Sequence, residues 1–218
     1  ILKYIECSCI IAENNRQIRK HASRHDHVVG EYKKFLKKQD LKWSAGADLH
    51  NLDTLIAIQN KTQEFLSRRD SIELNHTRIE RRGKDYDVLK EAYHKYIKDA
   101  DMDWTPDVDL EKLDSILAVQ NRTLEFISLR NRIVENHETL LKEGKGYKRV
   151  MDAYSKYAKD VDVAWTPEVD LQKLQAIISV QDSCKVIFSM QDKKGVNRTL
   201  KKEKLKNIAD IIEKLIQK

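Results

Sequence analysis

The chain repeats its own sequence at an interval of 61 residues, and this self-similarity limits the folds open to it more than any other feature. The segment 109–144, DLEKLDSILAVQNRTLEFISLRNRIVENHETLLKEG, is matched upstream by DLHNLDTLIAIQNKTQEFLSRRDSIELNHTRIERRG over residues 48–83. A third copy starts at Asp170 with DLQKLQAIISVQDSC. Aromatic residues mark the same step: Trp43, Trp104 and Trp165, and likewise Tyr32, Tyr93 and Tyr154. A fixed period predicts a tandem-repeat architecture.

Composition and hydrophobic periodicity predict that each copy is helical. The 218 residues are 35% charged and 40% hydrophobic, with only 6 glycines and 2 prolines, a mixture typical of all-α proteins. Apolar residues recur at three- and four-residue steps from about 109 to 141, which predicts a long helix. Gly144 ends it, and a shorter helix is expected over about 145–159. Its apolar stripe contains Tyr147, Val150, Met151, Tyr154, Tyr157, Ala158 and Val161.

The linkers between a short helix and the next long one read WSAGADL, WTPDVDL and WTPEVDL. Two of them predict a threonine N-cap with proline at the first helical position, at Thr105-Pro106 and Thr166-Pro167. An aspartate a few residues later is the alternative cap in each linker: Asp48, Asp109 and Asp170.

The unequal helix lengths predict an elongated array of short three-helix bundles. At 1.5 Å per residue, about 32 residues span roughly 48 Å and about 17 residues span roughly 26 Å. A short helix cannot cover a long one, so each long helix should continue into the next bundle. We expect bundles over residues 1–62, 62–123 and 123–184, followed by an incomplete helix pair over 185–218.

This layout resembles spectrin-type repeats in architecture, because long helices would be shared by successive bundles. The resemblance is to the architecture alone, since the sequence carries no motif of that family. The second possible layout is a superhelical stack of helix pairs with a concave binding face. Such stacks favour helices of similar length, so we prefer the rod.

Two polar or aromatic features recur inside this pattern. An asparagine stands within the predicted long helix of every copy: Asn14, Asn75, Asn136 and Asn197. A buried amide that fixes the register of packed helices is one interpretation, and a repeated ligand contact is the other. The linker tryptophans Trp43, Trp104 and Trp165 are predicted to close the ends of the bundles.

A zinc site is not predicted at Cys7, Cys9, His21 and His25. Both intervals in this Cys-x-Cys-x11-His-x3-His pattern depart from the usual finger spacing. On a helix, two residues at this separation point about 200° apart. His25 also stands at the repeat position of Tyr86 and Tyr147, an ordinary packing position.

His21, His25 and His27 with Asp26 are expected to be solvated turn residues, and the alternative is a pH-sensitive or metal-binding patch. The three cysteines, Cys7, Cys9 and Cys184, are too few for a disulfide framework and are expected to be reduced.

Catalytic signatures are absent from the sequence, which lacks GxSxG, P-loop, HExxH and GxGxxG patterns. Asp99, Asp101 and Asp103 lack the glycine and glutamate of an EF-hand loop and are interpreted as a solvated acidic turn. The glycosylation pattern falls within predicted helices and is interpreted as chance at Asn60, Asn75, Asn121 and Asn197. We therefore predict no catalytic, cofactor-binding or metal-binding residues.

The charge is distributed unevenly along the chain. The net charge is +6, and residues 1–45 and 185–218 are basic while the middle is acidic. No apolar run approaches the roughly 20 residues of a membrane span. The start of the chain aligns with the middle of a copy, so we expect a fragment of a longer protein.

The function predicted from these features is a non-catalytic helical scaffold, spacer or protein-interaction module. A cell-surface adhesin or ligand-binding repeat is the first alternative. A nucleic-acid binder using the basic ends is the second. A cytoplasmic location is the default expectation, with the bacterial cell envelope or surface as the other possibility.

Overall fold

The computed structural model describes residues 1–39, 49–100, 102–160 and 163–191. These residues form seven α-helices and two short 3-10 turns, and no β-strand occurs among them. The predicted all-α class is therefore confirmed.

The chain divides into two compact units, one built from residues 1–81 and 94–121 and the other from 82–93 and 122 onward. Several predicted features lie outside the described residues: Trp43, Asp48, Asp101, Asn197 and most of the helix pair over 185–218. Within the described parts of the chain, no helix is both long and apolar enough to cross a membrane.

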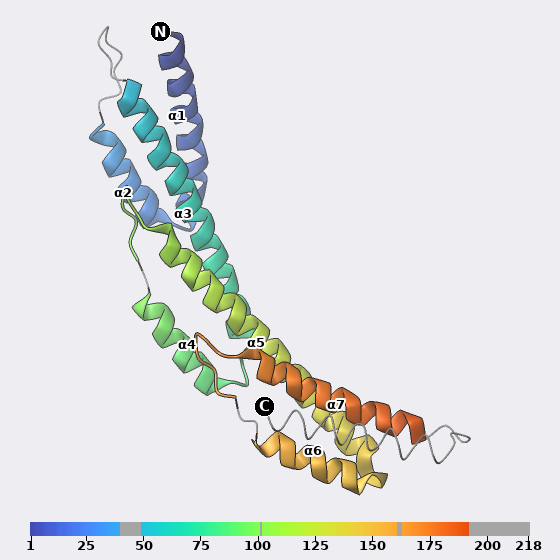
Figure 1. Ribbon diagram of the computed structural model, residues 1–218. Helices are drawn as coiled ribbons and strands as arrows, with labels where there is room; N and C mark the ends of the chain where they lie inside the picture. The colour runs from blue at the N-terminus through green and yellow to red at the C-terminus, as the bar shows by residue number, and fades with distance from the viewer. Residues whose placement is uncertain (40–48, 101, 161–162, 192–218) are drawn as a thin grey trace. The chain divides into compact units, whose positions relative to one another are not determined.

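Three helices lie side by side in the first unit (Figure 1): α1 (Leu2–Lys20), α2 (Asp26–Lys37) and the first part of α3 (Leu49–Arg82). The 3-10 turn His21–Ser23 joins α1 to α2. α2 buries Val29 and Tyr32, which are three residues apart on one face of the helix. The carboxylate of Asp26, in the first turn of α2, interacts favourably with the positive end of the helix dipole.

The later part of α3 packs against the start of α5 (Leu110–Glu143) within the first unit. The guanidinium of Arg68 on α3 holds the carboxylate of Asp114 on α5, with Nε and Oδ1 2.8 Å apart. The intervening helix α4 (Asp87–Asp99) begins in the second unit and ends in the first.

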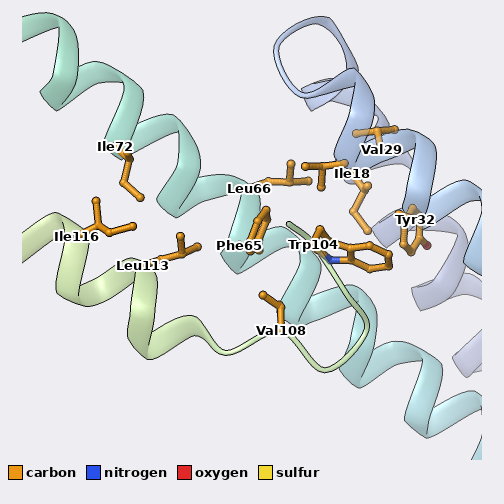
Figure 2. Packing of buried hydrophobic residues seen from close by; sticks show 11 residues of the cluster. Ile18, Val29, Tyr32, Phe65, Leu66, Ile72, Trp104, Val108, Leu113 and Ile116 are labelled. Atoms are coloured by element: carbon orange, nitrogen blue, oxygen red, sulfur yellow. The ribbon is translucent and has the colours of Figure 1, made fainter. Parts of the chain in front are cut away.

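A cluster of buried side chains in the first unit comes from α1, α2, α3, the linker before α5 and the start of α5 (Figure 2). Its members are Ile18 of α1, Val28, Val29 and Tyr32 of α2, Phe65, Leu66 and Ile72 of α3, Trp104 and Val108 of the linker, and Leu113 and Ile116 of α5. Each large apolar side chain buried in this way stabilises the fold by roughly 1.5–3 kcal/mol. The linker before α5 is thus part of the core.

The predicted threonine caps are wrong, and the aspartates cap the helices instead. α5 begins at Leu110, and Asp109 Oδ1 accepts the amide of Glu111 at 3.0 Å. The corresponding Asp170 accepts the amide of Gln172 at 2.9 Å, at the start of α7 (Leu171–Gln191).

The Thr-Pro pairs form tight turns before the helices. The amide of Val108 bonds the carbonyl of Thr105 at 3.1 Å, and Val169 bonds Thr166 in the same way at 3.1 Å. The fixed φ of proline suits a turn as well as a first helical position. The turn wins because it buries the valine at its end, as the 3% exposure of Val108 shows.

Three helices also lie side by side in the second unit (Figure 1): the later part of α5, α6 (Lys148–Asp160) and α7. The 3-10 turn Gly144–Gly146 joins α5 to α6. Gly144 is buried, and a Cβ built on it would lie 2.5 Å from Met151 Sδ and 3.2 Å from Phe188 Cζ. Only a residue without a side chain permits this close approach.

The long helices agree with the predicted length of about 32 residues, whereas α2, α4 and α6 contain 12, 13 and 13 residues and are shorter than the predicted length of about 17. α3 and α5 each contain 34 residues and run without a break past Gln59 and Gln120. α6 contains 13 residues and starts three residues later than predicted, because the 3-10 turn occupies the positions before it.

Candidate functional site

A buried glutamine joins the three helices of the first unit. Gln59 on α3 is 0% exposed, and its Nε2 donates to the main-chain carbonyl of Ile11 at 3.2 Å. The same nitrogen lies 2.8 Å from the hydroxyl of Tyr32 and 3.2 Å from Oδ1 of Asn15. Tyr32 in turn donates to Asn15. Burial raises the pKa of Tyr32, and the hydrogen bond from Gln59 opposes that rise.

The second unit contains the same arrangement 122 positions later. Gln181 is 0% exposed, and its Nε2 donates to the carbonyl of Ile133 at 2.9 Å and to the hydroxyl of Tyr154 at 2.9 Å. His137 takes the place of Asn15, with its Nδ1 3.0 Å from the Tyr154 oxygen. Gln120, at the middle position of the series, donates to the carbonyl of Ile72 at 3.0 Å.

These glutamines were not singled out from the sequence. The available signal was a polar residue that recurs at the same position in an otherwise apolar stripe. Three glutamines at 61-residue steps each bond a carbonyl 48 residues earlier, so the contact belongs to the repeating pattern. The amide nitrogens donate to protein acceptors, and Gln59, Gln120 and Gln181 are 0% exposed, which favours a structural role for this contact.

The linker tryptophans also recur in one bonding pattern. Trp104 Nε1 donates to Thr62 Oγ1 at 3.2 Å, and Trp165 Nε1 donates to Thr123 Oγ1 at 3.1 Å. Both indoles are more than nine-tenths buried. The ring of Trp104 meets the ring of Tyr32 edge-on, with centroids 5.9 Å apart.

The recurring asparagines bond across helices in the described copies. Asn14 Nδ2 donates to Asn60 Oδ1 at 3.1 Å, and Asn75 Nδ2 donates to Asn121 Oδ1 at 3.2 Å. The predicted role was that of a buried amide that fixes helix register, and Asn75 is buried while Asn14 is partly exposed. Asn60, Asn75 and Asn121 lie within helices, where the glycosylation pattern has no loop to act in.

The third asparagine of the series has a different partner. Asn136 is 7% exposed, and its Oδ1 accepts a hydrogen bond from Lys185 Nζ. Asp182 stands where the earlier copies carry Asn60 and Asn121, and it lies 3.9 Å from the same lysine nitrogen.

The structure separates the cysteines from the histidines of the zinc-like pattern. Cys7 is buried, with its Sγ 3.7 Å from Asp53 Oδ1, whereas Cys9 is exposed. Among the described residues, neither group of side chains with metal-ligand spacing includes a cysteine.

A carboxylate on α3 collects two of the predicted turn histidines. Asp70 Oδ2 lies 3.0 Å from His21 Nδ1, and Asp70 Oδ1 lies 3.0 Å from His25 Nε2. Burial favours the neutral form of Asp70, but the hydrogen bond and charge of His25, with the charges of His21 and Arg24, outweigh it and lower the pKa of Asp70. His27 lies apart from this cluster, 4.0 Å from Asp103 and 70% exposed.

The repeat explains the His25–Asp70 pair as a packing contact. The residues 61 positions later are Tyr86 and Asn131, and the Tyr86 hydroxyl donates to Asn131 Oδ1 at 2.6 Å. In each pair the two residues are 45 positions apart in the sequence, and their contact links the start of a short helix to a long helix. Glu73 completes a group with metal-ligand spacing at His25 and Asp70, but the repeat already accounts for their contact.

A second histidine–carboxylate cluster has no counterpart in the other copies. His76 and Glu80 lie on α3, and His94 lies on α4. His94 Nε2 is 2.6 Å from Glu80 Oε1, and the ring centroids of His76 and His94 are 5.8 Å apart. One potential ligand atom from each residue lies within 4.8 Å of the other two. Sequence reasoning missed this cluster because the two helices bring its members together.

No protein-family model, curated protein or solved structure matches this chain.

Proposed function

We propose that this chain is a helical-repeat scaffold or spacer that acts on a protein partner through its surface and has no enzymatic activity. In this proposal each 61-residue copy supplies one long and one short helix. Neighbouring copies form three-helix bundles that share the long helices, and the array grows along one direction.

The observation that carries the proposal is the recurring contact between a buried glutamine and a distant carbonyl. Gln59, Gln120 and Gln181 each reach a carbonyl 48 positions earlier, at 3.2, 3.0 and 2.9 Å. The side chains that recur along the chain are those that hold helices together. Some solvent-facing positions differ from copy to copy, for example His50 and Glu111, as expected of a structural array whose surface is free to vary.

The helix lengths support growth along one direction. A helix of 34 residues is about 51 Å long and one of 13 residues is about 20 Å long at 1.5 Å per residue. A chain that advances along a long helix and returns along a short one gains the difference, roughly 30 Å less the length of the linkers. A spacer uses such an increment to set the distance between two attached partners.

A deletion of one whole copy tests the proposal. Removing residues 62–122 joins Lys61 to Thr123, the residue that repeats Thr62, so every recurring contact keeps its register. We expect this variant to retain its helicity and to lose roughly 20–30 Å of maximum dimension in small-angle X-ray scattering. A control that removes 62–119 shifts the pattern by three residues, and we expect it to lose cooperative unfolding.

Compact behaviour would contradict the proposal. A globule of 218 residues has a radius of gyration of about 17 Å by the usual scaling. If the intact chain gives that value, or if the one-copy deletion leaves the maximum dimension unchanged, the spacer function is wrong.

A further inference from the structure

We propose that His76, Glu80 and His94 form a binding site for a divalent transition-metal ion, with Zn²⁺ as the occupant that the ligand set favours. The site goes beyond a scaffold function, because an ion held there would link α3 to α4 reversibly. Neutral imidazole and carboxylate are established zinc ligands, and two histidines with one glutamate can leave the fourth position of a tetrahedral ion open.

The geometry needs only a small adjustment to receive an ion. His76 and Glu80 are four residues apart on α3, so the helical period places them on one face. His94 approaches that face from α4, and one ligand atom of each residue lies within 4.8 Å of the others. Ligands at 2.0–2.2 Å around a tetrahedral ion lie roughly 3.3–3.6 Å from one another. The pair His94–Glu80, now 2.6 Å apart, would open slightly to admit the ion between them.

Neighbouring buried residues position the ligands. His76 follows Asn75, which is 8% exposed and bonded to Asn121, and Glu80 follows Ile79, which is 0% exposed. The packing of these neighbours fixes the rotation of α3 about its axis. The side chains of Glu80 and His94 are 39% and 49% exposed, so an ion can reach them from solvent.

The other copies show that the cluster is not needed for packing. The first copy has Asn15, Arg19 and Lys33 at the three positions, and the third has His137, Leu141 and Ser155. Neither set can bind a metal ion in this way, yet both copies contain the same recurring glutamine contact. The three ligands therefore occur together only in the middle copy, which indicates a local role for them.

Metal binding by the tag-free 218-residue chain is the direct test. We expect one Zn²⁺ per chain in competition with a chromophoric chelator, and a visible absorption band when Co²⁺ is added in its place. Binding should weaken as the pH falls below neutral, because protons compete for the imidazole ligands. The melting temperature should rise with free Zn²⁺, since an ion that binds only the folded state stabilises it.

Variants borrowed from the other copies separate binding from folding. His76→Asn and His94→Ser install the residues that the first and third copies carry at these positions, so the fold should tolerate them. We expect each to lower Zn²⁺ affinity by roughly 100-fold or more while circular dichroism without metal stays unchanged. His137→Asn, at the repeat position of His76, is the matched control and should leave the affinity as it is.

A second control addresses the other histidine–carboxylate group. His25→Tyr removes the histidine beside Asp70 and installs the residue found at Tyr86. We expect no change in the Co²⁺ band or in the Zn²⁺ affinity. The proposal is overturned if His25→Tyr abolishes binding, if His94→Ser leaves it intact, or if the 218-residue chain binds no Zn²⁺ at micromolar concentrations. The spacer function would survive that result, because it depends on different residues.

Discussion

The side-chain amide of Gln181 donates a hydrogen bond to the main-chain carbonyl of Ile133, 48 residues earlier, over 2.9 Å. That carbonyl lies inside α5, so a helix oxygen with an intrahelical partner receives a second bond from α7. The oxygen of the same amide, Gln181 Oε1, is buried without a hydrogen-bond partner. Because the amide oxygen is buried without a partner, we expect Gln181 to fix the position of α7 against α5 more than to stabilise the fold.

Two substitutions of Gln181 should therefore distinguish how much its side-chain volume and its hydrogen bonds each contribute to the free energy of unfolding. Gln181→Leu fills the space and removes the unpaired oxygen, and Tyr154 keeps its contact with His137, so we expect a change within about 1 kcal/mol. Gln181→Ala leaves a cavity and should lower the free energy of unfolding by roughly 2–4 kcal/mol. Urea denaturation measures both. Equal losses for the two variants would show that the hydrogen bonds dominate.

The buried hydrogen bond from Trp104 to Thr62 should stabilise the fold. Thr62→Val removes the acceptor 3.2 Å from the buried indole nitrogen and should cost about 1–2 kcal/mol. The matched control is Thr77→Val, since the hydroxyls of Thr62 and Thr77 both donate to the carbonyl four residues earlier but Thr77 is exposed. Its effect should stay within about 0.5 kcal/mol. A double-mutant cycle with Trp104→Phe isolates the coupling, and a value of zero would contradict the contact.

Two glycine substitutions should act in opposite directions. Gly144→Ala brings a Cβ within 2.5 Å of Met151 Sδ, so the methionine must move, and we expect a loss of about 1 kcal/mol. Gly30→Ala lies within α2 with nothing inside 4 Å of the new Cβ, and it should stabilise by about 0.5–1 kcal/mol. Thermal melts of both variants test this contrast. A stabilising Gly144→Ala would show that the turn has room for a side chain.

The Asp70 carboxylate should make the free energy of unfolding depend on pH in the acidic range. Its pKa is lowered in the folded chain, so its contribution is complete above the ordinary value of 3.8 and is lost as the pH falls through the folded value. Asp70→Asn should therefore destabilise by roughly 1 kcal/mol at pH 6, with the difference from wild type vanishing towards pH 2. Denaturation curves across this range provide the measurement.

The double variant His25→Tyr with Asp70→Asn offers a control for that result. It copies the Tyr86–Asn131 pair, whose hydroxyl and carbonyl oxygens are 2.6 Å apart. We expect it to be more stable than Asp70→Asn alone and to lack the acid-dependent step between pH 5 and about pH 2. An undiminished step in this variant would assign the acid dependence to other carboxylates.

Cys9 and Cys184 should differ in their reaction with iodoacetamide. Cys9 is exposed, whereas Cys184 is 0% exposed and its burial raises the pKa of the thiol to about 11. At pH 8 roughly one Cys184 thiol in a thousand would be ionised. We expect mass spectrometry to find Cys9 alkylated first and Cys184 alkylated only in urea. Rapid modification of native Cys184 would mean that the core around it opens readily.

Secondary structure was predictable because helical periodicity is a local property of the chain. The long helix expected over about 109–141 is observed as Leu110–Glu143. The cap of that helix was assigned to the wrong residue, because Thr105-Pro106 suits a turn and a helix start equally well. The burial of Val108 decided between them, and burial depends on which segments pack together.

The sequence by itself determined that the described residues are helical and approximately where their helices lie, and it showed that residue types recur at steps of 61. The tertiary structure alone decided which polar groups meet. Gln181 is hydrogen-bonded to Ile133 and Asp70 to His25, and the rings of His76 and His94 are in contact. These pairs are 48, 45 and 18 positions apart in the sequence. No local pattern encodes such pairs, because packing fixes the rotation and offset of each helix only when the apolar faces of several helices are buried together.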